Sequence, residues 1–475
     1  MRRRPTLRRR LLARRRDERG AALVVVLGAV AVMAVLLSDV QQDSGATFAA
    51  ALSERDALIA EYNARSGVNL ARLLVATEPA VRKAVAPMLA LLGAGSGGQM
   101  KPPQIPVWEF ADQILGPFND AAGAEAFKGL AQLDLSTGKS LGLSGGRFEL
   151  TVADEDSKLN VNVGARGDAI SELRLSMQLM ALMGSPQYQP LFEALDADGQ
   201  PSDPRTICGA LIDWADSDED LQGCDDPNST TPTRGIEDNY YQNIGQPYMR
   251  KNAAYDSLEE LRLVRGMSDD FWATFVEPER GNPKDRALTV WGQGAVNVNS
   301  ASPLTLLAII CANATDAAMC VDPVQAQSFI MGVTLVRGFT MGAPLFPSRK
   351  DFVQTMKGGG LIGPFLSEFG VQPVTFRSDV EVRDMIATES KVFSFHVTGI
   401  AERQVSEDET VETRVDVVAV VDFRQAVDLQ SYMPAGDPNA PPPGSSASSA
   451  DQAALALSSA LVSNPLGNVV YWRIE

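Results

Sequence analysis

An uncharged apolar run near the N-terminus constrains this chain more than any other feature. Residues 21–38, AALVVVLGAVAVMAVLLS, contain no charged side chain. At about 1.5 Å per helical residue, such a run approaches the roughly 30 Å hydrocarbon core of a bilayer. It follows a block of ten arginines within residues 1–20. Because positive flanks resist translocation, we expect the N-terminus to stay in the cytoplasm and the rest of the chain to be exported.

The apolar run continues into an amphipathic segment. A secretory signal peptide would end at an A-x-A type site followed by a turn-rich start. Here residues 38–43, SDVQQD, lead directly into residues 44–85, whose apolar side chains recur with a 3.6-residue period. We therefore predict one long helix over residues 21–98, with 21–38 crossing the membrane. An ordinary uncleaved signal anchor is the alternative.

The junction before the apolar run has the form of a processing site. Gly20 ends the basic block and Ala21 begins the apolar run. This segment resembles the prepilin leader of type IV pilins and type II secretion pseudopilins. The resemblance implies a leader over residues 1–20, cleavage by a prepilin peptidase between Gly20 and Ala21, and methylation of the new N-terminus.

The fifth position after that site departs from the pilin pattern. The resemblance implies a glutamate there, paired with the N-terminal amine of a neighbouring subunit, but this chain has Val25. A carboxylate in lipid is costly unless it is paired. Its absence suits a subunit with no predecessor to pair with, and so predicts a place at the tip of an assembly.

Charge and cysteine content agree with export. The chain has 42 Lys and Arg against 59 Asp and Glu, a net charge of −17, and loss of residues 1–20 would make it more acidic. Such a charge opposes binding to nucleic acid. The four cysteines form two sequence-local pairs, Cys208 with Cys224 and Cys311 with Cys320, which predict two disulfides in an oxidising compartment. Four reduced core thiols are the alternative.

Hydrophobic periodicity divides the rest of the chain. A Pro-rich break follows the long helix, and residues 147–164 alternate as two strands joined by an acidic turn. Residues 168–370 are mostly helical in spacing, and strand patterns return over 375–425 and in the closing NVVYWRIE. We predict an α+β fold, with a head built from 99–167 and 371–475, an inserted helical region over 168–370, and a flexible insertion over 433–456.

Five motifs in order make the resemblance specific. They are ADEDSKLNVN (153–162), LIDWADSDED (211–220), GIEDNYY (235–241), SLEELRLVRGM (257–267) and AVNVNSASPLTLLAI (295–309). Together, behind a pilin leader, they resemble the minor pseudopilin K family of type II secretion systems.

The family resemblance implies a fold, a place and partners. The implied fold is pilin-like, with a long N-terminal transmembrane helix, an antiparallel sheet and a large inserted α-helical, SAM-like domain. The implied function is to initiate or cap the pseudopilus at its tip and so support protein export across the outer membrane. The implied partners are minor pseudopilins I and J, other pseudopilins and the inner-membrane secretion platform. The implied location is the bacterial inner membrane, crossed once, with the C-terminal domain in the periplasm.

An acidic cluster is the candidate metal site. Hard oxygen donors gather in a loop-rich stretch beside the first cysteine pair, and irregular oxygen-rich loops suit calcium better than magnesium. The spacing is not that of an EF-hand. The family resemblance implies bound calcium, which we assign to Asp213, Asp216, Asp218, Asp220, Glu237 and Asp238. A merely solvated acidic loop is the alternative.

Catalytic patterns are weak, and we predict no enzyme. Asp154, Glu155 and Asp156 fit turn chemistry better than acid/base hydrolysis. The single histidine, His396, lies in a strand pattern, so no His-centred triad or zinc site can be assembled. The segment SLEELRLVRGMSDDFW resembles helix-hairpin-helix modules, but its acidic residues favour protein packing over phosphate contacts. The leading alternative function is a membrane-anchored periplasmic calcium-binding module or hydrolase.

Overall fold

The computed structural model describes most of the chain. The described residues are 7–92, 102–116, 146–193, 195, 199, 202–225, 239–243, 248–340, 343–406, 409–427 and 464–475. The flexible insertion predicted over 433–456 lies outside these residues.

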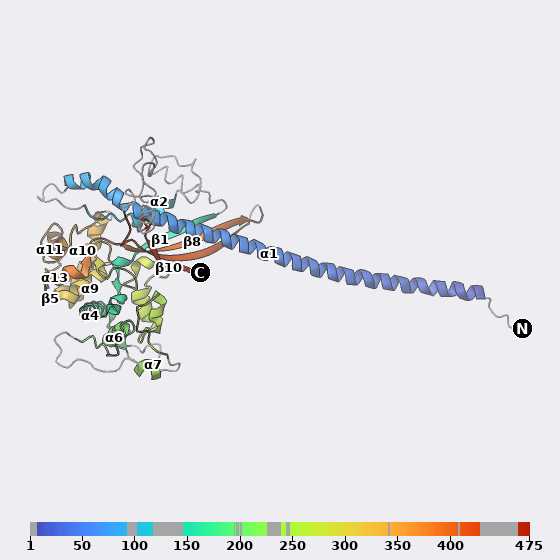
Figure 1. Ribbon diagram of the computed structural model, residues 1–475, viewed down its shortest axis with the longest axis horizontal. Coiled ribbons are helices and arrows are strands. Elements are labelled where there is room, and N and C mark those ends of the chain that lie inside the picture. The colour runs from blue at the N-terminus through green and yellow to red at the C-terminus, as the bar shows by residue number, and fades with distance from the viewer. Residues whose placement is uncertain are drawn as a thin grey trace, which may run out of the picture.

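One helix, α1 (Leu7–Leu92), runs the length of the molecule. Its N-terminal part projects as a rod from the head, and its C-terminal part packs along one side of the head (Figure 1). The packed part presents small side chains, and Ala60, Ala64 and Ala71 are fully buried. Small residues at helical spacing let the helix backbone approach a sheet closely. The predicted single long helix is therefore confirmed over residues 21–92, and residues 93–98 lie outside the described residues.

The head is organised around a four-stranded antiparallel sheet. Its strands are β1 (Gly146–Asp154), β8 (Val392–Gln404), β9 (Thr410–Asp422) and β10 (Asn468–Ile474), in the order β1-β8-β9-β10. The predicted strands of VFSFHVTGIAERQ, TRVDVVAVVDFRQ and NVVYWRIE are all present in this sheet. The α+β class, with a long apolar N-terminal helix and an antiparallel sheet, is confirmed.

Alternation along the strands sends one set of side chains toward α1. Phe148, Phe395 and Val417 are among the buried residues that form a core with α1. The contact is closest at Gly399, where an added Cβ would lie 1.9 Å from the carbonyl oxygen of Ala60. Only glycine allows the two backbones to meet at this point.

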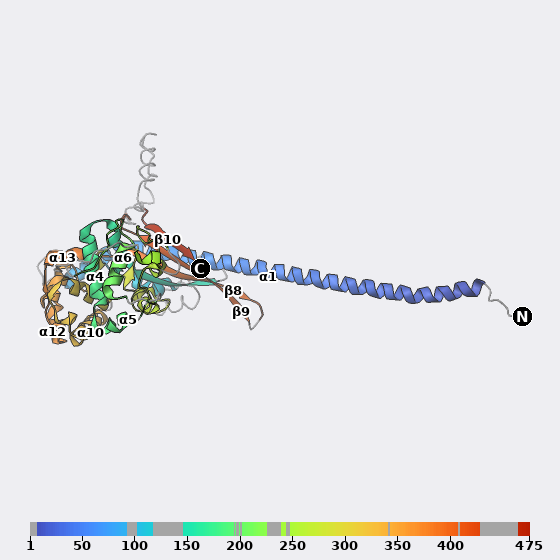
Figure 2. The same cartoon turned by 90° about the horizontal axis from the view of Figure 1, so that it is seen from below.

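A second, larger core belongs to the chain between β1 and β8 and extends from Leu159 to Ile386. The longer helices of this inserted region are α4 (Ala169–Met183), α6 (Pro204–Asp213), α9 (Pro303–Asn313), α10 (Pro323–Phe339), α11 (Arg349–Met356), α12 (Gly363–Glu368) and α13 (Asp379–Met385). Shorter helices are α2 (Ala111–Leu115), which precedes β1, and α5 (Gln189–Glu193), α7 (Asn239–Asn243) and α8 (Asp269–Phe271). Helices α4 and α6 lie on the side of the head away from α1 (Figures 1 and 2).

Three two-stranded pairs tie the inserted region together. Parallel pairs join β2 (Leu159–Asn160) to β3 (Leu288–Thr289) and β4 (Val296–Asn297) to β7 (Ile386–Ala387), and an antiparallel pair joins β5 (Ala314–Asp316) to β6 (Thr375–Phe376). Because the paired strands are distant in sequence, each pair fixes the position of one part of the inserted region against another.

Two strand predictions are wrong in part. Residues 147–164 do not form two neighbouring strands, because β1 ends at Asp154 and the chain turns through 3₁₀ segments around the two-residue β2. Residues 375–383 form a strand only at β6, after which Ser378 caps α13 by accepting a hydrogen bond from the backbone N–H of Glu381. Side-chain capping offered the backbone a helical path that alternation did not reveal.

Candidate functional site

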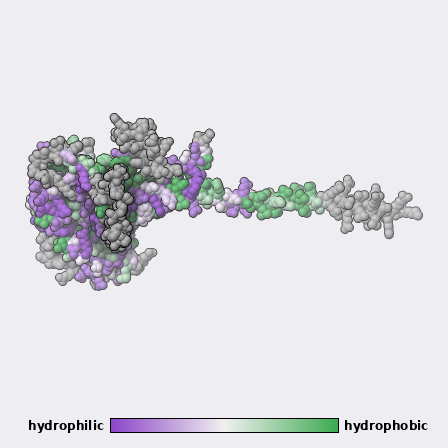
Figure 3. Space-filling model, turned by 45° about the horizontal axis from the view of Figure 1, so that its top comes forward, coloured by the Kyte–Doolittle hydropathy of each residue, from purple (hydrophilic) through white to green (hydrophobic). Residues whose placement is uncertain are grey.

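The exposed apolar surface of α1 is the first candidate site. Residues 21–50 are exposed on every side of the helix, and Val25 is 70 % exposed. Figure 3 shows the apolar stretch as a band on the projecting rod. In the described part of the chain, α1 is the one helix long and apolar enough to cross a membrane. Apolar surface of this extent requires a membrane or a partner to cover it.

The predicted cleavage position lies inside this helix. Helix α1 passes through Gly20 and Ala21 without interruption. The backbone that would precede and follow the predicted cut is therefore helical in the uncleaved chain.

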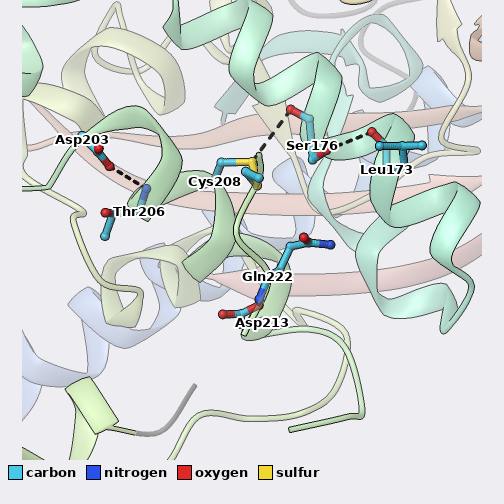
Figure 4. Close-up of a disulfide and its surroundings, with 8 residues drawn as sticks. Leu173, Ser176, Asp203, Thr206, Cys208, Asp213 and Gln222 are labelled. Carbon is cyan, nitrogen blue, oxygen red and sulfur yellow. Dashed lines mark hydrogen bonds between the residues drawn. A yellow bond between two sulfur atoms is a disulfide. The ribbon is translucent and has the colours of Figure 1, made fainter. Parts of the chain in front are cut away.

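The second candidate site is a loop closed by a disulfide. The bond from Cys208 in α6 to Cys224 spans 16 residues, and a second bond joins Cys311 to Cys320. Both predicted disulfides are present. Inside the first loop, the backbone N–H of Gln222 donates to Asp213 Oδ1 at 2.8 Å, which brings the returning chain against the end of α6 (Figure 4).

Two of the predicted metal ligands are buried at this point. Burial raises the pKa of Asp213 to about 8, and the nearby carboxylates of Asp216 and Asp218 add to the rise. Burial likewise raises the pKa of Asp216 to about 7, with further contributions from Asp218 and Glu172. Each carboxyl therefore resists ionisation, although the positive charge of Arg250 opposes the rise in both pKa values.

Asp216 also has an oxygen without a hydrogen-bond donor. Its Oδ1 is buried and unpartnered. The guanidinium of Arg250 lies 3.8 Å from that oxygen, too far for a hydrogen bond. Arg250 instead donates to the carbonyl oxygens of Asp213 and Asp218 at 3.0 and 2.7 Å, and so fastens the loop.

The remaining predicted ligands are dispersed or outside the described residues. Asp218 and Asp220 are exposed, and the Asp220 N–H donates to Asp218 Oδ1 at 2.8 Å. Glu237 and Asp238 lie outside the described residues. Within the described ranges, no three acidic, histidine or cysteine side chains are grouped to hold a metal ion. The donor chemistry of Asp213 and Asp216 fits a cation, but the described residues alone do not complete a coordination shell.

The consecutive acids Asp154, Glu155 and Asp156 form a buried junction. Asp154 Oδ2 accepts hydrogen bonds from the hydroxyls of Ser300 and Ser390. These donors are far from the acids in sequence, so the contacts connect β1 to the inserted region and to the chain just before β8.

The other two acids of the junction are equally well satisfied. Glu155 pairs with Lys158 Nζ at 3.1 Å and accepts from Ser394 and Thr289. Asp156 accepts three backbone N–H groups, from Gln293, Lys391 and Val392. Sequence reasoning placed these acids in a simple turn and missed the long-range donors. The run of three acids followed by a lysine at a strand end was the signal for a buried network.

The helix-hairpin-helix-like segment, residues 257–272, packs against the second core. Leu258 and Leu261 are buried in the second core, and Gly266 adopts a φ of +84° against the side chain of Ile207. These contacts place the apolar face of the segment inside the protein, as the prediction of a packing role expects.

These features define an α+β protein with a long, exposed apolar N-terminal helix, an antiparallel sheet and a large helical insertion that contains two disulfides. Residues 157–276 match the family model described as "Type II secretion system (T2SS), protein K". This part of the chain is therefore similar to protein K of type II secretion systems, in agreement with the resemblance predicted from the motifs.

Two known proteins are similar to this chain. The type II secretion system protein K of Aeromonas hydrophila is 31 % identical over 97 residues, which are 20 % of this chain and 24 % of that protein. The match thus spans about a quarter of that relative's length. A chain in the crystal structure of the GspK-GspI-GspJ complex from the enterotoxigenic Escherichia coli type 2 secretion system aligns with a TM-score of 0.33 and 14 % identity, covering 58 % of this chain and 75 % of that one.

Proposed function

We propose that this protein is a minor pseudopilin at the tip of the type II secretion pseudopilus, where it initiates or caps assembly and supports protein export across the outer membrane. The observation that carries the proposal is the match of 157–276 to the protein K family model, in a chain with an exposed apolar helix near its N-terminus. In this proposal the protein is not an enzyme, and its partners are minor pseudopilins I and J, other pseudopilins and the secretion platform.

Helix α1 would anchor the subunit before assembly. Its apolar half would sit in the inner membrane, crossing it once, and the head would face the periplasm. The prepilin peptidase would cut between Gly20 and Ala21, and the exposed apolar surface would then pass from lipid to neighbouring pseudopilin helices.

Val25 and the insertion support the tip position. A subunit with no predecessor has no N-terminal amine to pair with, so an apolar residue at the fifth mature position avoids an unpaired carboxylate in lipid. The insertion, whose second core runs from Leu159 to Ile386, adds bulk on the side of the head away from α1. Such bulk would not fit between the subunits of a closely packed shaft.

Calcium belongs to the same proposal. Asp213, Asp216 and Asp218 would supply carboxylate oxygens, joined by Asp220, Glu237 and Asp238. The buried, unpartnered Asp216 Oδ1 and the raised pKa of Asp213 support a cation at this loop. Bound calcium would neutralise the two buried acids and hold the disulfide-closed loop in place.

A calcium titration tests the metal. We expect the Tm of the full chain to rise with calcium and to fall with a chelator, because an ion that binds only the folded state stabilises it. The Asp216→Asn variant should lose this response, whereas Asp270→Asn, at an exposed position of α8, should keep it. An unchanged Tm in wild-type protein would remove calcium from the proposal.

Mass spectrometry of the mature N-terminus tests the pseudopilin assignment. We expect protein purified from its native membrane to begin at methylated Ala21. A chain that retains residues 1–20 would instead favour the alternative, a membrane-anchored periplasmic calcium-binding module or hydrolase. Such a protein needs no leader cleavage and no pilin partners.

A further inference from the structure

A cleft of about 610 Å³ lies between the sheet and the inserted region. The sheet contributes His396 of β8 and Tyr471 of β10, which lie on the face opposite the α1 core. The inserted region contributes Trp272, Arg286 and Trp291. Small-molecule sites typically have volumes of about 300–1,000 Å³, so the cleft has the size of a ligand site.

Aromatic rings form its apolar walls. Trp291 and Tyr471 meet with ring centroids 5.2 Å apart, which joins the inserted region to the edge strand β10. The guanidinium of Arg262 lies over the ring of Trp272 at 3.9 Å. Flat aromatic surfaces at two sides suit a planar or apolar group.

The carboxylates of the lining are already paired. Arg473 forms ion pairs with Glu259 and Glu475, and Arg414 lies 3.8 Å from Glu149. The Trp272 indole donates a hydrogen bond to Glu277, and the Thr398 hydroxyl donates one to Asp416. Three of these carboxylates therefore face an arginine, and the other two accept hydrogen bonds from neutral donors.

Arg286 is the exception among the charged groups of the lining. Within the described residues it has no ion-pair or hydrogen-bond partner, and its Nε is buried. The positive charge of Arg286 helps to lower the pKa of Glu155. The carboxylate of Glu155, however, is paired with Lys158 at 3.1 Å. A buried guanidinium nitrogen without an acceptor is costly, and an anion beside it removes that cost.

His396 adds a second unsatisfied group to the same cleft. Its Nε2 is buried without a hydrogen-bond partner. Burial is the largest cause that lowers the pKa of His396, which falls to about 4. The positive charges of Arg286 and Lys158 contribute to this fall, and the negative charge of Glu155 opposes it. The imidazole is therefore neutral at pH 7, with one nitrogen able to donate and the other able to accept.

We propose that this cleft binds an organic carboxylate carried on an aromatic or apolar body. Arg286 binds the carboxylate, His396 lies beside it, and Trp272, Trp291 and Tyr471 hold the body. The planar fork of an arginine matches a carboxylate in two-point contact. Every group that forms the site belongs to this chain, so binding there requires no pseudopilin partner.

The single histidine provides a direct readout. The full chain in detergent, labelled with [¹³Cε1]histidine, gives one signal because His396 is the only histidine. The probes are phenylacetate, as a free small acid, N-acetylphenylalanine, as the end of a peptide, and the neutral amide of N-acetylphenylalanine. We expect at least one acid to shift the signal saturably and to raise the pKa of His396, while the amide does neither. The acid that binds more tightly identifies the source of the carboxylate.

Variants of Arg286 test whether this side chain binds the carboxylate of the probe. Arg286→Gln should weaken binding of the acid at least about tenfold, as loss of a charged hydrogen-bond partner does. Arg280→Gln, an exposed arginine outside the lining, should bind like wild type. If Arg286→Gln does not fold, Arg286→Lys, which keeps the charge but loses the fork, should still bind more weakly than wild type. Equal binding of acid and amide, no response to either acid, or wild-type affinity in the Arg286 variants overturns the proposal.

Discussion

Two buried acids of the junction, Asp154 and Asp156, provide the sharpest test of how the head and the insertion are joined. We predict that Asp156→Asn destabilises the protein and that Asp154→Asn does not, although both side chains are buried at the same junction. The difference comes from the donors that each carboxylate meets. It therefore tests the hydrogen-bond network and not burial alone.

The donors around Asp156 cannot reverse their role. Oδ2 accepts the backbone N–H groups of Lys391 and Val392, and Oδ1 accepts that of Gln293. An asparagine must point its NH₂ group at one side, so at least one buried N–H loses its acceptor. An orphaned buried donor costs about 1–3 kcal/mol, and two cost roughly twice that.

The donors around Asp154 can reverse their role. Its Oδ2 meets the hydroxyls of Ser300 and Ser390, which can accept from an NH₂ group as readily as they donate to an oxygen. Its Oδ1 would still accept from the Asp156 N–H at 2.9 Å. The asparagine therefore keeps every hydrogen bond of the aspartate.

The pH dependence of the free energy of unfolding gives a second way to compare Asp154→Asn with wild type. Burial and the neighbouring Asp156 raise the pKa of Asp154 from 3.8 to about 7 in the folded protein. A raised carboxyl pKa means that the folded state holds the proton more tightly than the unfolded state. The resulting stability is full below pH 3.8 and is lost as pH rises through about 7. Asp154→Asn should thus gain stability relative to wild type between pH 5 and pH 8, by on the order of 3 kcal/mol.

Urea unfolding followed by tryptophan fluorescence measures both effects. Wild type, Asp154→Asn and Asp156→Asn are compared at pH 5 and pH 8 in the same detergent. Equal destabilisation by the two substitutions, or a pH-independent difference between Asp154→Asn and wild type, would refute the reasoning.

Three further predictions concern the helix, the disulfides and the tip. Gly399→Ala should lower the free energy of unfolding by about 1–3 kcal/mol or more, because the added methyl meets helix backbone. Gly338→Ala, with open space around it, should be neutral or stabilising, and the Tm of the two variants measures the difference. Cys208→Ser should cost about 3 kcal/mol and Cys311→Ser slightly less, since the first disulfide closes the longer loop, and denaturation with and without reductant measures both. Val25→Glu should impair secretion in a complementation assay if the subunit has no predecessor; normal secretion would argue against the tip position.

Local features of this protein followed from its sequence alone. The apolar run of 21–38 and the 3.6-residue period after it predicted α1, because a helix is a local structure whose pattern can be read along the chain. The three long C-terminal strands followed from alternation, and the disulfides from the short separation of each cysteine pair. The five ordered motifs pointed to the family that the comparison with 157–276 supports.

The junction and the cleft were decided only by tertiary structure. Asp154 meets Ser390 across 236 residues, and no periodicity within either segment encodes that contact. Alternation also failed at residues 375–383, where a side-chain cap and packing in the second core favoured α13. Arg286 did not stand out in the sequence, and His396 stood out only as the single histidine. What distinguishes them is a buried nitrogen without a hydrogen-bond partner among the described residues. Burial removes water from such groups, so their chemistry depends on neighbours that only the folded chain brings together.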